Sequence, residues 1–258
     1  MIDRDVPSEL QGFAVDESYG PQGRIGLITV GSTLETPLYE FYILVPRGVA
    51  LVARHMQIRT VDLASADRAL SSLTTTAEEL RHYSVDCVVV LGGPMAYLEG
   101  EPLTRAEEIR SSVESAAGVK TIFEWTASMD ALHHLGVESV AVATPFVDHN
   151  NQRLAKAMAL NRFDVRAISG AGLEGNPDFT VQHLRTCMDT ASRALELAGE
   201  VDALFIACPR WPVLPLVEEI EARFGLPVVA SNQSWVWALK QEMGPSFPVV
   251  PIGRLLAA

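Results

Sequence analysis

The sequence predicts an α/β protein with two pseudosymmetric lobes, each a four-stranded parallel sheet flanked by helices, and an active site between the lobes. Apolar runs of strand length alternate with helical patterns, as a parallel sheet covered on both faces requires. The chain also repeats, because Asp86-Cys-Val-Val-Val-Leu-Gly-Gly-Pro94 returns as Asp202-Ala-Leu-Phe-Ile-Ala-Cys-Pro209. A duplicated α/β unit is the simplest explanation of this repeat.

A second pair of segments supports the duplication. The run from Thr121 to Leu132 returns in pattern as the run from Val228 to Leu239, each an apolar strand followed by a helix start. Ligands bind outside the carboxyl ends of the strands in open parallel sheets. We therefore expect two units with facing strand ends to form a cleft lined by both.

The elements are expected in alternation along the chain, with right-handed crossovers. Continuous Val, Ile, Leu and Ala runs predict strands at 24–30, 50–59, 87–92, 120–124, 138–144, 164–168, 202–208 and 227–231. The segments between them predict helices at 64–83, 103–117, 126–135, 148–161, 178–198, 212–224 and 232–243.

The lobes follow from this order. Residues 1–23 are polar and rich in turn residues, and are interpreted as an N-terminal arm. The first lobe is expected at 24–136 and the second at 137–258, with the boundary near Gly136. An alternative is that the last helix packs against the first lobe.

Composition narrows the classes of partner. A net charge of −12 disfavours nucleic acids and anionic membranes, since the long-range field has the wrong sign. No apolar run approaches the ~20 residues of a membrane span, and the N-terminus lacks the pattern of a signal peptide. Three cysteines without regular spacing suit a reducing compartment. We expect a cytoplasmic protein, and its oligomeric state stays open.

Cys208 is the candidate for chemistry. The offset that carries Asp86 onto Asp202 also carries Gly92 onto Cys208, so two equivalent strand ends hold one glycine and one cysteine. A thiol between an apolar strand and a Pro-rich turn into a helix is a candidate nucleophile or proton carrier, with a pKa lowered by the helix start. A buried structural cysteine is the alternative.

Other sites have weaker support. The core is the preferred location of Cys87 and Cys187. No His-Glu-x-x-His or Cys-x-x-Cys pattern indicates a metal, and no Gly-x-Gly-x-x-Gly turn or Walker loop indicates a nucleotide. We expect neither metal nor cofactor.

Four segments resemble the aspartate/glutamate racemase superfamily, most closely its arylmalonate decarboxylase and maleate cis-trans isomerase branches. The segments are Thr144–Leu154, Ile206–Cys208, Pro227–Gln233 and Gly92–Gly100, and the resemblance covers roughly residues 24–243. It implies two pseudosymmetric α/β lobes, an interlobe site and no cofactor.

The glycine and cysteine separate the branches. Racemases and maleate isomerases of this superfamily have a cysteine in each lobe, whereas here the first-lobe position is Gly92 and only Cys208 remains. This pairing resembles arylmalonate decarboxylase. The resemblance implies loss of carbon dioxide to give a planar enediolate, which the single cysteine protonates from one face.

The chain departs from the decarboxylase at its hydrogen-bond donors. Hydroxyl residues that follow the glycine in that family are Gly93 and Pro94 here, and a tyrosine is replaced by Phe146. Pro209, directly after the cysteine, has no N–H for an oxyanion. The asparagine that maleate isomerases have after the first strand is Gly31.

Replacements can be named from position. Arg210 is a candidate clamp for a carboxylate, and its alternative is a solvated turn residue. Ser32, Thr33 and Ser231 are candidate hydroxyl donors or helix caps. Backbone N–H groups near Gly92 and Gly93 are further donors. Tyr97, Trp125 and Trp211 are candidates for an aromatic wall of the cleft, and their alternative role is to cap the hydrophobic core. Glu35 and Glu124 are candidate general bases if they are buried.

The preferred function is a cofactor-independent decarboxylase that acts on a small carboxylate with Cys208 as the proton donor. A maleate-isomerase-like or racemase-like isomerase is the alternative, and a covalent cysteine adduct would indicate the maleate-isomerase-like reaction. A catalytically silent binding protein of the same fold is a further alternative.

Overall fold

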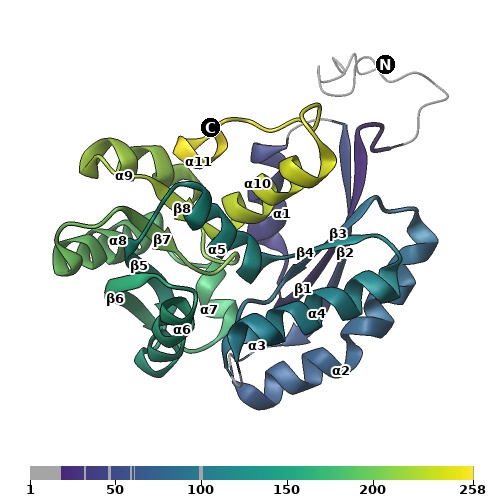
Figure 1. Cartoon of the computed structure of the whole chain (residues 1–258), viewed down its shortest axis with the longest axis horizontal. Coiled ribbons are helices and arrows are strands. Elements are labelled where there is room, and N and C mark those ends of the chain that lie inside the picture. Colours follow the sequence, from purple (N-terminus) through teal and green to yellow (C-terminus); the bar gives the residue numbers. More distant parts are fainter. Residues whose placement is uncertain are drawn as a thin grey trace, which may run out of the picture.

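The computed structural model describes residues 19–31, 33–45, 48–58, 60, 62–98 and 101–257. They form two four-stranded parallel sheets with the orders β2-β1-β3-β4 and β6-β5-β7-β8 (Figure 1). The strands are β1 (Gly23–Gly31), β2 (Val49–Ile58), β3 (Cys87–Leu91), β4 (Lys120–Phe123), β5 (Ser139–Phe146), β6 (Asp164–Leu173), β7 (Ala203–Ile206) and β8 (Val228–Ala230). The identical order in both sheets confirms the predicted fold class.

Helices cover the faces of both sheets (Figure 1). They are α1 (Glu35–Leu44), α2 (Leu63–Leu80), α3 (Pro94–Tyr97), α4 (Pro102–Ala117), α5 (Glu124–His134), α6 (Asp148–Leu160), α7 (Asn176–Thr180), α8 (Leu184–Ala198), α9 (Val217–Phe224), α10 (Ser231–Met243) and α11 (Gly253–Ala257). Two 3₁₀ turns precede β3 and α9, at Arg81–Tyr83 and Leu214–Leu216.

All eight expected strands are present, and the largest error in the helices is α1, which was not predicted. The buried face of α1 includes Pro37 and the polar residues Thr36 and Glu40. These two polar residues conceal the amphipathic pattern of the helix. The helix expected at 178–198 is two helices, α7 and α8.

The repeated aspartates have the same role in both sheets. Oδ2 of Asp86 accepts the N–H of Arg24 at 2.8 Å, at the start of β1. Oδ2 of Asp202 accepts the N–H of Ser139 at 2.7 Å, at the start of β5. Each carboxylate thus joins an inner strand to the start of its neighbour, which explains why the repeat includes both aspartates.

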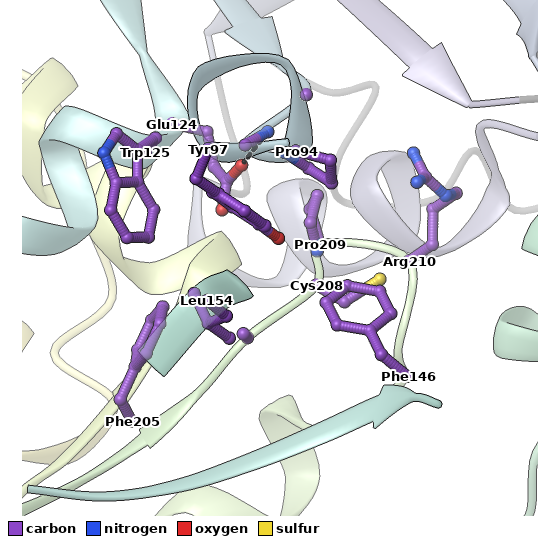
Figure 2. Close-up of a pocket in the computed structure, with 13 residues that line it drawn as sticks. Pro94, Tyr97, Glu124, Trp125, Phe146, Leu154, Phe205, Cys208, Pro209 and Arg210 are labelled. Atoms are coloured by element: carbon purple, nitrogen blue, oxygen red, sulfur yellow. Dashed lines mark hydrogen bonds between the residues drawn. The ribbon is translucent and has the colours of Figure 1, made fainter. Parts of the chain in front are cut away.

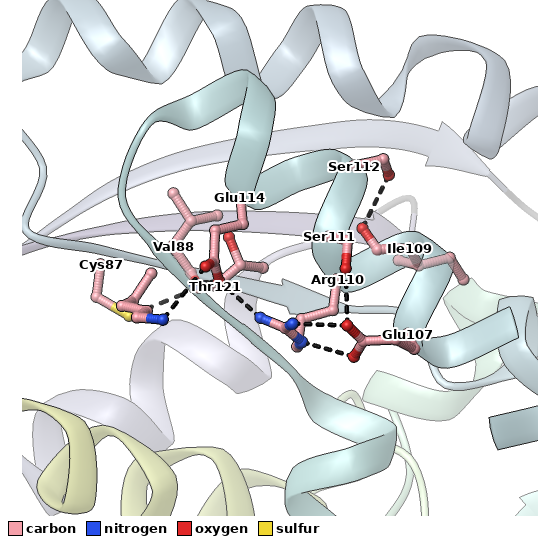
Figure 3. A network of polar contacts seen from close by, with 10 residues as sticks. Cys87, Val88, Glu107, Ile109, Arg110, Ser111, Ser112, Glu114 and Thr121 are labelled. Atoms are coloured by element: carbon pink, nitrogen blue, oxygen red, sulfur yellow. Dashed lines mark hydrogen bonds and ion pairs between the residues drawn. The ribbon is translucent and has the colours of Figure 1, made fainter. Parts of the chain in front are cut away.

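A salt-bridged network joins α4 to β4 (Figure 3). Glu114 accepts hydrogen bonds from Arg110 at 2.7 Å and from the N–H of Thr121 at 3.2 Å, and Arg110 also binds Glu107. Beside this network, Cys87 is fully buried in the sheet, and burial raises its pKa to about 12. This thiol has the core location that was expected for it.

Apolar packing crosses from one lobe to the other. In Figure 1, α5 and α10 lie side by side between the sheets, and α10 also packs against α1. Phe41 of α1 stacks on Trp235 of α10, with ring centroids 5.4 Å apart and an interplanar angle of 9°. Both apolar clusters contain residues of both sheets, such as Val88 with Val142. The lobes are therefore held in a fixed relation by apolar packing.

Within the described residues, none of the helices combines the length and apolar character needed to cross a bilayer.

We predict that Phe41→Ala lowers the free energy of unfolding by about 3–5 kcal/mol, because it removes a fully buried ring and its stacking contact with Trp235. Urea denaturation followed by circular dichroism measures the change. The control is Tyr39→Ala on the same helix, whose side chain is 72% exposed and whose loss should change stability by less than about 0.5 kcal/mol. A loss below about 1 kcal/mol for Phe41→Ala would contradict the packing described.

Candidate functional site

A narrow cavity lies between the two sheets at the carboxyl ends of their strands (Figure 2). It lies at the points where the strand order of the two sheets reverses, the place where open parallel sheets bind ligands. Its lining comes from both lobes and consists of Gly92, Gly93, Pro94, Tyr97, Glu124, Trp125, Phe146, Leu154, Phe205, Ala207, Cys208, Pro209 and Arg210.

Cys208 occupies a strained backbone position at the edge of this cavity. Its φ of 97° lies in the left-handed region, which costs a residue with a side chain on the order of 1–3 kcal/mol. Two hydrogen bonds hold this conformation: its N–H donates to Oγ of Ser231 at 3.1 Å, and its carbonyl accepts the N–H of Trp211 at 3.1 Å. The turn aims the thiol at the cavity beside Phe146 (Figure 2).

The expectation of a lowered pKa for Cys208 is wrong. The side chain is 5% exposed, and burial raises its pKa, more than the Arg210 guanidinium and the Arg210 N–H lower it. The next helical turn along the chain begins only at Leu214, so the helix start expected directly after the thiol is not there. Cys208 is therefore a neutral thiol at neutral pH.

Glu124 and Ser231 occupy equivalent positions in the two lobes. They are the first residues of α5 and α10, and the offset that aligns Thr121 with Val228 also aligns Glu124 with Ser231. Glu124 accepts the N–H of Gly93 at 3.0 Å, just as Ser231 accepts the N–H of Cys208. The Ser231 side chain is close enough to the Glu124 carboxyl group to lower its pKa, although burial raises that pKa more. Each helix start therefore holds the strand-end turn of its own lobe.

Arg210 is buried and reaches from the second lobe to the first. Its side chain is 5% exposed, lines the cavity and lies directly against Gly31 at the end of β1. A Cβ at position 31 would overlap the guanidinium group, so a side chain there would displace Arg210 from this position. The alternative of a solvated turn residue is excluded, and a guanidinium fork at this depth can hold a carboxylate.

Glu40 of α1 anchors the loop that follows Cys208. Its buried carboxylate accepts the N–H groups of Val213 at 3.0 Å and Leu214 at 2.9 Å, and Nδ2 of Asn232 at 2.5 Å. Asn232 also donates to the carbonyl of Pro209 at 2.8 Å. Burial raises the pKa of Glu40 to about 7, against the effect of these donors. The first lobe thus positions the turn that carries the thiol and the guanidinium.

Aromatic and aliphatic side chains form the walls. Tyr97 packs on Trp125 with ring centroids 5.1 Å apart, and its hydroxyl points toward the Cys208–Arg210 turn (Figure 2). Phe146 meets Phe179 edge to face at 5.5 Å. The walls suit a substrate with an apolar or aromatic substituent, since such a group gains free energy when it leaves water.

The structure brings together most of the residues singled out from the sequence. Cys208, Arg210, Gly92, Gly93 and Phe146 line the cavity. Gly31 and Ser231 lie directly behind it, in contact with Arg210 and Cys208. Thr33 is half-buried and does not line it. Ser32 lies outside the described residues.

Two further expectations are decided by burial. Glu124 is 4% exposed and lines the cavity, whereas Glu35 is exposed at the start of α1, so the idea of Glu35 as a buried base is wrong. Trp125 and Tyr97 form part of the cavity wall, whereas Trp211 is fully buried and does not line the cavity. Cys187 is a core residue as expected.

Sequence reasoning missed Glu40 because its helix was missed. The partners of Glu40 lie more than 170 residues away along the chain, so no local pattern signals the contact. Leu154 and Phe205 were also missed as wall residues, although both belong to apolar segments that were recognised.

No cluster of three or more side chains suited to metal binding occurs among the residues that the structure describes.

Comparison with known proteins agrees with this geometry. A family model described as arylmalonate decarboxylase matches residues 25–256. The chain belongs to the arylmalonate decarboxylase family. This confirms the resemblance found in the sequence.

Relatives of this family are named as two kinds of enzyme. Arylmalonate decarboxylase from Bordetella bronchiseptica is 26% identical over 205 residues, 79% of this chain and 85% of that protein. Maleate isomerase from Nocardia farcinica is 26% identical over 259 residues, 90% of this chain and 95% of that protein. A solved arylmalonate decarboxylase variant, with one glycine changed to cysteine and one cysteine to serine, shares the fold. Its TM-score is 0.83 at 24% identity, over 90% of this chain and 98% of the other.

We predict that iodoacetamide labels Cys208 more slowly than a small free thiol at pH 7.5, because burial raises the pKa of the thiol and limits access. Peptide mapping by mass spectrometry gives the rate, which should still be rising above pH ~8.5, the ordinary thiol pKa. Cys208→Ser identifies the peptide. A labelling rate that reaches its plateau below that pH would contradict the assignment of a neutral thiol.

We predict that Glu40 makes stability depend on pH. Its carboxyl binds a proton more tightly in the folded state, with a pKa of about 7, than in the unfolded state at 4.5. The free energy of unfolding therefore falls as pH rises through this range, by roughly 3 kcal/mol in total. Urea denaturation at about pH 5 and pH 8 should show a difference that is smaller by about 2–3 kcal/mol in Glu40→Gln.

The matched control is Glu35→Gln, an exposed residue on the same helix, which should keep the wild-type difference. An unchanged difference in Glu40→Gln would show that Glu40 does not titrate in this range.

Proposed function

We propose that this protein is a cofactor-independent decarboxylase, in which the single thiol of Cys208 protonates the carbanion left by loss of carbon dioxide. Its substrate would be a small malonate-type diacid with an aromatic or bulky apolar substituent. The observation that carries the proposal is the pairing of one thiol with a glycine, Gly92, across one buried cavity.

A thiol side chain at position 92 would fit only if Val30 and Met95 moved. A Cβ at this position would lie 2.7 Å from Cγ2 of Val30 and 2.8 Å from Cε of Met95, closer than real Cβ contacts. The remaining cysteines, Cys87 and Cys187, are buried in the core and do not line the cavity. This supports chemistry with one thiol over a reaction that needs one thiol from each lobe.

The protonation state of Cys208 favours a proton donor over a nucleophile. Addition to a conjugated diacid requires the thiolate, whereas protonation of a carbanion requires the thiol. Burial raises the pKa of Cys208, so the proton stays on sulfur at neutral pH. This favours the decarboxylase over the isomerase.

The cavity offers two different environments to the two carboxylates of a malonate. Arg210 would hold the carboxylate that remains, through paired N–H donors. The other carboxylate would lie against the apolar wall of Phe146, Phe205 and Leu154. A charge in apolar surroundings is destabilised, and departure as neutral carbon dioxide relieves this.

The chemical steps then balance without a cofactor. The bond between Cα and the unheld carboxylate breaks, and its electron pair moves into the remaining carboxylate to form an enediolate. The Cys208 thiol transfers its proton to Cα, which gives a monocarboxylate. Water then returns a proton to the thiolate, which restores the site for the next turnover.

The relatives support the same assignment. In the arylmalonate decarboxylase variant described above, a glycine is replaced by cysteine and a cysteine by serine. The natural enzyme therefore has a glycine and a cysteine at these two positions. This chain pairs the same types at Gly92 and Cys208.

We predict that the wild-type protein releases carbon dioxide from phenylmalonate or 2-methyl-2-phenylmalonate and that Cys208→Ala lowers kcat by about 10³-fold, the effect of losing a positioned general acid. Carbon dioxide release and NMR in deuterated water measure it, with one deuterium entering Cα from one face. The control is Cys187→Ala, a buried thiol outside the cavity, which should keep the wild-type rate.

Intact mass spectrometry with maleate separates the alternatives. No adduct is expected on Cys208. Conversion of maleate to fumarate with a covalent adduct would instead assign isomerase chemistry. Binding of acids without turnover of either substrate class would favour a binding protein.

A further inference from the structure

The cavity lacks the side-chain hydroxyl donors that its family resemblance implies, and a carboxyl group lies in their place. Positions 93 and 94 are glycine and proline, and position 146 is phenylalanine. The enediolate of the proposed reaction carries more negative charge on oxygen than one guanidinium offsets, and loss of one oxyanion donor lowers kcat by roughly 10²–10³-fold. A further donor is therefore needed within the cavity.

The carboxyl group of Glu124 lies directly beside the position that a side chain of residue 93 would occupy. A Cβ built on Gly93 would lie 3.1 Å from Oε2 of Glu124, and the N–H of Gly93 donates to this same oxygen at 3.0 Å. The side chain lines the cavity and is 4% exposed. Figure 2 shows the Glu124 carboxyl group with its hydrogen bond to the strand-end turn of the first lobe, and Tyr97 is among its neighbours.

We propose that Glu124 works in its protonated form, as the hydrogen-bond donor that holds an oxygen of the bound carboxylate and of the enediolate. This inference rests on the proposed function for the class of ligand, a small monocarboxylate or diacid. Glu124 would then replace the missing hydroxyl side chains of the first lobe.

The surroundings of Glu124 support the protonated form. Burial raises its pKa, more than hydrogen bonds from Ser231 and Gly93 lower it. The charged or titratable groups that face it are Arg210, Tyr97 and Cys208. Tyr97 and Cys208 are neutral, because burial raises the pKa of each above its ordinary value. A ligand carboxylate beside Arg210 would raise the pKa of Glu124 further, since like charges repel.

The competing role for Glu124 is a general base, and the two roles predict opposite results. A donor must be protonated, so ligand affinity falls as pH rises, and a glutamine amide can replace it. A base must be ionised, so activity rises with pH, and glutamine abolishes it.

The test measures the affinity for phenylacetate, the product expected from phenylmalonate, by isothermal titration calorimetry between pH 5.5 and pH 8.5. The proteins are the wild type, Glu124→Gln and the control variant Glu35→Gln, which changes an exposed carboxyl group outside the cavity lining. Thermal unfolding confirms that each variant is folded.

For the wild type we expect Kd to rise at least tenfold across this range. Glu124→Gln should bind within threefold of the acidic wild-type value at every pH, whereas Glu35→Gln should keep the wild-type dependence on pH. Tyr97 and Cys208 titrate above this range, so they do not contribute.

Three results would overturn the donor role: a wild-type Kd that does not change with pH, a folded Glu124→Gln that no longer binds, or one that keeps the full pH dependence. Absence of binding by the wild type at every pH would also overturn it. Carbon dioxide release from phenylmalonate is scored separately. Release with a pH-independent Kd refutes only the donor role, and the expected Kd pattern without release refutes only the decarboxylase.

Discussion

The site depends on the hydrogen bonds accepted by the first residues of α5 and α10, two helices that pack against each other. Ser231 accepts the backbone N–H of Cys208, and Glu124 accepts that of Gly93, each in the strand-end turn of its own lobe. These bonds set the conformation of both turns at once, including the left-handed backbone of Cys208. Because the strain of that residue must be offset by its surroundings, the thiol's direction is a property of both lobes.

Glu40 strengthens this arrangement from the other side of the turn. It holds Val213, Leu214 and Asn232 from a helix of the first lobe, and the Phe41–Trp235 stack lies next to it in the chain. A polar anchor and an apolar contact on the same helix thus fix the loop after the thiol.

The electrostatics of the cavity follow from its burial. Cys208, Glu124 and Tyr97 all have a raised pKa because the cavity excludes water, and Arg210 supplies positive charge among them. A site in this state attracts an anion and keeps acidic protons in place. Those two properties are what protonation of an enediolate requires, whereas a site built for thiolate attack needs the opposite shift at sulfur.

The sequence by itself determined the strands, the duplication and the pairing of Gly92 with Cys208, because strand periodicity and residue type are local properties. It did not reveal α1, whose buried face carries Thr36 and Glu40, nor the contacts of Glu40 with the second lobe. The direction of the Cys208 pKa shift was also decided only by the tertiary structure. A pKa depends on the summed desolvation and charge of neighbours from both lobes, and no spacing along the chain encodes that sum.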